Sequence, residues 1–186
     1  MDHHVNLRLL PSPEIAQPHL MSALFGKLHR ALAAHQGSDI GVSFPHVGPQ
    51  QLGDLLRLHG MARALDTLLA RPWLGGVNDH VEVGGLLRVP AQTGCRCVRR
   101  VQAKSSAARL RRRLMRRHGC SEAEARQRIG DEVEQRLDLP FVSMQSASTD
   151  QTFRLFIEHG PVTDIAIAGP FSAYGLSHGA TTVPWF

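Results

Sequence analysis

The chain has 186 residues, of which 42% are hydrophobic, so we expect one or two small domains with a buried core and no extensive disorder. It has no apolar run long enough to span a membrane and no secretory signal pattern, and its three cysteines favour a cytoplasmic protein with reduced thiols. The formal charge of +5 is unevenly spread, because ten of the 21 Lys and Arg residues lie between Ala91 and Ser121, where there is no Asp or Glu.

Hydrophobic residues in the first half of the chain recur with two different spacings. Val5, Leu7 and Leu9 recur every second residue, as in a half-buried strand, whereas the leucines that follow Pro18 recur every four residues, as in a helix. The predicted elements are strands at 5–9, 40–44, 52–59 and 80–89 and helices at 18–36 and 61–70. Their order, strand, helix, strand, strand, helix, strand, is the ferredoxin-like βαββαβ arrangement, which unrelated proteins share.

The second half is predicted to be a smaller α+β domain. Ser105 or Ser106 can cap a helix that runs to about His118, and Ser121 with Glu124 forms a capping box for the next helix. Short strands are predicted at 141–146, 152–158, 162–168 and 171–176. The change in composition places the boundary between a ferredoxin-like domain at 1–93 and an RNA-binding domain with the arginine-rich helix at 94–186.

The predicted basic helix carries charges of a single sign. Steps of three and four residues place arginines along one broad side, at Arg109, Arg112, Arg113 and Arg116. Guanidinium groups can bind phosphate oxygens bidentately, so the helix predicts a nucleic-acid site, with a solvated charged helix as the alternative. Aromatic residues make up only 5% of the chain, and the first and third strands have none, which favours a structured RNA hairpin over an unpaired strand.

Two polar residues precede this helix. Arg100 and Gln102 would face the same way in an extended segment, and Arg and Gln are the side chains that read guanine and adenine in a major groove. Without the neighbouring basic helix, two ordinary surface residues would be the better interpretation.

Candidate catalytic residues are scattered along the chain. His29 lies one turn beyond Phe25, and Gly26 on the same side of the helix would let a ligand come close. A polar cluster from Ser146 to Thr149 and the single tyrosine, Tyr174, beside a glycine could contact ribose or phosphate. Each has a structural alternative: a surface histidine, a polar turn and an edge-strand aromatic. We expect no metal site, so a nuclease would use the 2′-OH of RNA as its nucleophile.

Several stretches together resemble the CRISPR repeat-processing endoribonucleases of type I-F systems. The similarity runs from end to end and includes LMSALFGKLHRAL, RVQAKS, RLRRRLMRRH, LDLPFV, FRLFI and the terminal VPWF. The resemblance implies that the substrate is precursor CRISPR RNA, cut at the 3′ foot of each repeat hairpin to leave 2′,3′-cyclic phosphate and 5′-hydroxyl ends. It also implies that no cofactor takes part, that the protein stays bound to the product, and that it joins other subunits of the surveillance complex.

The resemblance carries over to individual residues. It implies that His29 acts in acid–base catalysis, that Ser146 holds the ribose at the cut and that Tyr174 orients the histidine. Further positions match RNA contacts of the family: Arg100, Gln102, Arg113, Arg116, Arg117, Ser148, Thr149 and Phe153, the last by stacking on the base pair at the foot of the stem. The basic segment adds Lys104, Arg109, Arg112 and His118 as candidates.

Two other functions fit the same sequence. A non-catalytic subunit that binds an RNA hairpin would share the basic helix but need neither His29 nor Ser146. A DNA-binding regulator would bind a DNA hairpin of the same sequence with comparable affinity, which we do not expect.

Overall fold

The computed structural model describes residues 1–102, 107–130, 137–146 and 150–186. It divides into two compact units, a larger one formed by residues 1–100 and 139–186 and a smaller one formed by residues 101–138. The predicted boundary between residues 93 and 94 falls inside the larger unit, between its two sheets, and stays a prediction. None of the described helices is long and apolar enough to cross a membrane.

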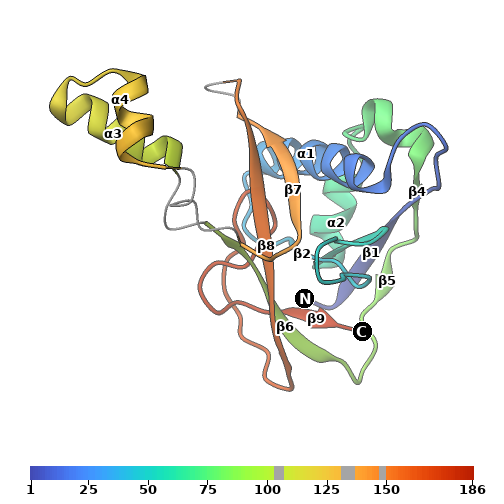
Figure 1. Cartoon of the computed structure of the whole chain (residues 1–186). Helices are drawn as coiled ribbons and strands as arrows, with labels where there is room; N and C mark the ends of the chain where they lie inside the picture. Colours follow the sequence, from blue (N-terminus) through green and yellow to red (C-terminus); the bar gives the residue numbers. More distant parts are fainter. Residues whose placement is uncertain (103–106, 131–136, 147–149) are drawn as a thin grey trace. The chain divides into compact units, whose positions relative to one another are not determined.

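The first sheet confirms the ferredoxin-like prediction. Its strands pair antiparallel in the order β2-β3-β1-β4, and a short β5 also pairs with β1 (Figure 1). The elements are β1 (His3–Leu9), α1 (Gln17–His35), β2 (Gly41–Ser43), β3 (Leu55–Gly60), α2 (Ala62–Leu69), the 3-10 helix η1 (Gly75–His80), β4 (Val81–Val83) and β5 (Leu87–Arg88). The predicted strand at 80–89 is therefore two short strands, separated where Gly84 and Gly85 interrupt it.

Hydrophobic periodicity explains how these elements pack. Val5 and Leu7 are fully buried and pair with Leu58 and Leu56 of β3. The buried face of α1 repeats every three or four residues, and it includes Leu20, Leu24, Phe25, Leu28 and Leu32. One side of α1 is thus fixed in the core, while the residues between these positions are left for a functional surface.

The second sheet contains strands that the sequence predicted only in part. Its order is β7-β8-β6-β9, with β6 (Gly94–Val101), β7 (Phe141–Gln145), β8 (Thr152–Thr163) and β9 (Val183–Trp185). β6 was not predicted as a strand, because arginines and cysteines obscure its alternation. The strand predicted at 162–168 is wrong beyond Thr163, where β8 ends. The strand predicted at 171–176 is also wrong, since there only Phe171 forms an isolated bridge, with Ser177.

The smaller unit contains α3 (Ala107–His118) and α4 (Glu122–Arg128), which pack against each other. The capping box predicted for α4 is confirmed, since the Ser121 hydroxyl accepts from the Glu124 amide and the Glu124 carboxylate accepts from the Ser121 amide. Arg111 donates from its Nε to the carbonyl of Ile129 at 2.8 Å and so ties α3 to the end of α4. The predicted caps Ser105 and Ser106 lie outside the described residues.

Candidate active site

His29 lies on α1 and is held by two contacts from a loop that is distant in the sequence. Its Nδ1 is 2.8 Å from the carbonyl oxygen of Ala173, and its ring stacks on Tyr174 with centroids 4.0 Å apart. Because a carbonyl only accepts hydrogen bonds, Nδ1 must carry the proton. In the neutral ring this leaves a lone pair on Nε2, which can accept a proton from a substrate.

The loop that holds His29 is itself fixed by backbone geometry. Gly175 adopts a φ of 70°, and a Cβ there would lie 2.6 Å from Val42, so a glycine is required at this position. Its carbonyl accepts a hydrogen bond from the Val42 amide at the sheet edge. Tyr174 also stacks on Phe25, at a centroid distance of 6.3 Å. The imidazole is thus aligned by aromatic contacts that connect it to the core.

His29 lines an open cavity of about 510 Å³. α1 forms one wall, the end of β7 forms another, and Ser146, the residue after β7, also lines the cavity. Gly26 also lines the cavity, and a Cβ there would have nothing within 4 Å, so this position leaves room for a ligand as the sequence suggested. The structure therefore brings His29, Ser146 and Tyr174, the three predicted catalytic residues, to one cavity.

An aromatic and a basic side chain border the same site. Phe153 lines the cavity, and the guanidinium carbon of Arg100 lies 5.8 Å from the Phe153 ring and 5.7 Å from the Tyr174 ring. The predicted groove reader Arg100 is thus placed beside the catalytic candidates. Ser148, Thr149 and Lys104 lie outside the described residues.

The remaining predicted RNA contacts belong to the smaller unit. Gln102 is exposed, and so are the six basic residues of α3 that were predicted to bind RNA: Arg109, Arg112, Arg113, Arg116, Arg117 and His118. Leu110 and Leu114 of the same helix are half-buried. The helix thus presents guanidinium groups to solvent, where they can reach phosphates.

Sequence reasoning missed several residues of the cavity. Ser22, Lys27 and Arg30 line it from α1, and helical spacing from His29 could have suggested them. The Ala173 carbonyl could not have been found, because it is a backbone acceptor 144 residues away from His29.

A second histidine, His59, contacts a hydroxyl group but is inaccessible to solvent. Nε2 of His59, on β3, lies 2.8 Å from the hydroxyl of Ser43, on β2, and both side chains are buried. Burial, reinforced by repulsion from Arg57, holds the pKa of His59 well below its usual value. This pair resembles a nucleophile and its base, but no substrate can reach it, and we assign it a structural role.

A ferredoxin-like sheet, a histidine that lines an open cavity and an exposed arginine-rich helix together fit a protein that binds nucleic acid. The model of the family described as CRISPR-associated protein (Cas_Csy4) matches residues 4–186. The chain is 56% identical over 188 residues to the CRISPR-associated endonuclease Cas6/Csy4 of Pseudomonas aeruginosa (strain UCBPP-PA14). It is 47% identical over 186 residues to the protein of the same name from Escherichia coli (strain UTI89 / UPEC), and both comparisons cover 100% of each chain.

The chain therefore belongs to the Cas_Csy4 family of CRISPR-associated proteins. This membership confirms the resemblance seen in the sequence and the predicted class of enzyme, an endonuclease. The roles of individual residues stay predictions.

Proposed function

We propose that this protein is a metal-independent endoribonuclease that cuts precursor CRISPR RNA at the 3′ foot of the repeat hairpin. The observation that carries the proposal is the placement of His29, whose Nδ1–H is occupied by the Ala173 carbonyl while its ring lines the cavity that Ser146 and Phe153 also line. A neutral imidazole with a free lone pair on Nε2 is the form that a general base requires.

The reaction uses the substrate's own nucleophile. The ribose 2′-oxygen attacks the adjacent phosphorus, and the bond from phosphorus to the 5′-oxygen breaks. His29 moves the proton that leaves the 2′-OH or the proton that the 5′-oxygen takes up, a contribution of about 10²–10⁴-fold. The products are a 2′,3′-cyclic phosphate and a 5′-hydroxyl. Because DNA has no 2′-OH, it is bound at most and never cut.

The neighbouring side chains position the RNA for this step. Ser146, which lines the cavity, holds the ribose at the cut through hydrogen bonds, and Tyr174 keeps the imidazole aligned by stacking. The base pair at the foot of the stem stacks on Phe153. Arg100 lies beside Phe153, where it binds a base edge in the groove or a phosphate. In this proposal the stem lies beside Phe153 and Arg100, with the scissile phosphate over His29.

The arginine helix supplies affinity. Its exposed guanidinium groups neutralise phosphates of the hairpin, so that binding is tight and falls steeply with salt. This affinity supports retention of the product hairpin, and through it assembly with the other subunits of a type I-F surveillance complex.

The proposal is tested with the host's repeat RNA in excess EDTA, beside a copy that carries a single 2′-deoxy nucleotide at the expected cut and a DNA hairpin of the same sequence. We expect cleavage of the first, binding without cleavage of the second, and weaker binding of the DNA. Mass spectrometry of the products would identify the cyclic phosphate. Binding without cleavage of either RNA would favour a non-catalytic hairpin-binding subunit, and cleavage of both would contradict 2′-OH attack.

A further inference from the structure

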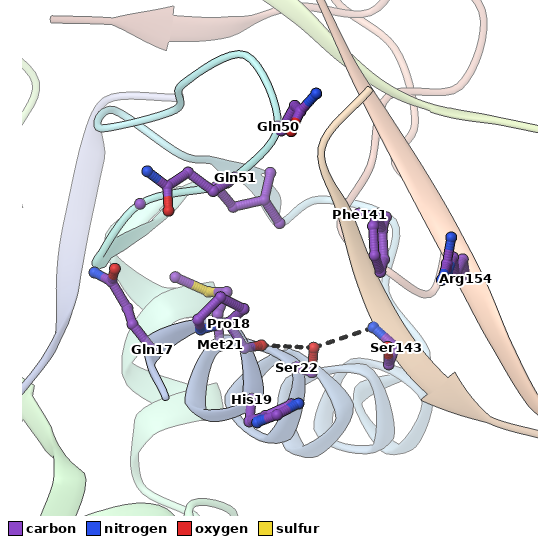
Figure 2. Close-up of a pocket in the computed structure, with 12 residues that line it drawn as sticks. Gln17, Pro18, His19, Met21, Ser22, Gln50, Gln51, Phe141, Ser143 and Arg154 are labelled. Carbon is purple, nitrogen blue, oxygen red and sulfur yellow. Dashed lines mark hydrogen bonds between the residues drawn. The ribbon is translucent and has the colours of Figure 1, made fainter. Parts of the chain in front are cut away.

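A second cavity, of about 370 Å³, adjoins the one that contains His29 and shares Ser22 and Ser143 with it (Figure 2). No step of the proposed reaction uses it. We propose that this cavity binds the first nucleotides of single-stranded RNA on the 3′ side of the cut. The assignment rests on the proposed function, because it names a further subsite for the same substrate.

The two cavities meet between α1 and β7, at Ser22 and Ser143. Ser22 donates to the Pro18 carbonyl at 2.8 Å and accepts from the Ser143 amide at 3.0 Å, so its hydroxyl joins helix and strand where the cavities meet. Toward one end, β7 leads to Ser146 and α1 to His29. Toward the other, β7 begins at Phe141 and α1 reaches Pro18, which lies about 16 Å along the helix axis from His29.

The two cavities would take different parts of the RNA. Phe153 and Arg100, which we assign to the foot of the stem, lie at the His29 end. Once the scissile phosphate is over His29, the next nucleotides on the 3′ side are no longer paired. The second cavity adjoins this site past Ser22 and Ser143, and neither Phe153 nor His29 lines it, so it is free to take the unpaired nucleotides.

The lining of the second cavity fits an unpaired base and its phosphate. The guanidinium carbon of Arg154 lies 4.7 Å from the centroid of the Phe141 ring, and such a pair offers a flat face for stacking together with a positive charge. Gln51 lies across the space from Phe141 in Figure 2, and its side-chain amide can both donate to and accept from a base edge. Among the described residues that line the cavity there is no Asp or Glu, so no carboxylate of theirs repels a phosphate.

The test compares three RNA hairpins with the full-length protein, each with a 2′-deoxy nucleotide at the cut so that only binding is measured. The first ends one nucleotide after the cut, the second has four more nucleotides on the 3′ side, and the third has four more on the 5′ side. Stacking of one base on an aromatic platform predicts that the 3′ extension lowers Kd by roughly five- to tenfold. Equal affinity for all three, or a gain from the 5′ extension alone, would overturn the assignment.

Variants then test whether residues of the second cavity account for the tighter binding of the 3′-extended hairpin. Arg154→Ala and, separately, Gln51→Ala should remove most of the gain from the 3′ extension while leaving the Kd of the short hairpin unchanged, which also shows that the variants are folded. Arg71→Ala removes an exposed arginine beyond the end of α2 and is the matched control that should keep the gain. A full gain in both the Arg154 and Gln51 variants would contradict the proposed subsite.

Failure of this inference is distinguishable from failure of the proposed function. Unmodified versions of the short and 3′-extended hairpins are incubated with wild-type protein in EDTA. If neither is cut, the proposed function is wrong. If both are cut while their 2′-deoxy copies bind equally well, the proposed function stands and the second cavity is not a subsite for the strand that leaves.

Discussion

The two units of the chain are built on different physical principles. In the larger unit, His29 has a fixed ring orientation because Tyr174, Phe25 and the Ala173 carbonyl connect it to a buried core. In the smaller unit, α3 carries exposed arginines, whose guanidinium groups stand at the ends of long side chains. Precise alignment suits a proton transfer, whereas flexible guanidinium groups suit phosphates whose positions vary. Mutations around His29 should therefore change the cleavage rate, and mutations in α3 should change the affinity for RNA.

The largest effect is expected from His29→Ala. Loss of the acid–base group should lower the single-turnover cleavage rate at saturating protein by about 10²–10⁴-fold, while Kd for the hairpin changes by roughly twofold or less. His35→Ala, on the last turn of the same helix, is the control and should cut normally. Wild-type cleavage by His29→Ala would remove the histidine from the mechanism.

Acid should destabilise the larger unit through His159. Burial, followed by repulsion from Arg96, lowers the pKa of His159 to about 4 from 6.5, and its ring packs edge-on against Phe44 and Trp185. Because the unfolded chain binds this proton more readily, the stabilisation is present above pH 6.5 and is lost as the pH falls from 6.5 toward 4.

Urea unfolding can measure this linkage. For a pKa lowered by about 2.5, wild type should lose roughly 3 kcal/mol more than His159→Gln over the interval from pH 6.5 to pH 4. Subtracting the variant removes the contribution of His59, whose pKa burial also lowers. Parallel curves for the two proteins would show that His159 does not titrate in this range.

A smaller effect is expected at Tyr174, where the ring rather than the hydroxyl makes the contacts described above. Tyr174→Phe should keep the cleavage rate within about twofold, whereas Tyr174→Ala should lower it by roughly three- to tenfold, because stacking contributes about 0.5–1.5 kcal/mol. The comparison is made under single-turnover conditions. Equal losses in the two variants would assign a direct role to the hydroxyl.

The sequence predicted what depends on periodicity and missed what depends on long-range backbone contacts. Alternation in β1 and the leucine spacing of α1 were sufficient, because each has one buried face. The segment at 171–176 has apolar and aromatic residues like a strand, yet the left-handed Gly175 turns it into the loop that holds His29. Periodicity also could not separate His29 from His59, since accessibility is decided by the layers packed over each residue.

The smallest effect is expected in the smaller unit, from Arg116→Ala. Removing one exposed guanidinium group should weaken hairpin binding and lower the slope of log K against log salt by about one unit, because one fewer phosphate is neutralised. The cleavage rate at saturating protein should not change. Kd is measured at several salt concentrations.

Arg126→Ala is the matched control for this measurement. Arg126 lies on α4 of the same unit and is paired with Glu122 at 2.9 Å, so its charge is already compensated and the slope should stay at the wild-type value. An unchanged slope in Arg116→Ala would remove Arg116 from the phosphate contacts. A fall in the cleavage rate at saturation would instead mean that α3 also aligns the RNA at His29, and the division of chemistry and affinity between the two units would be wrong.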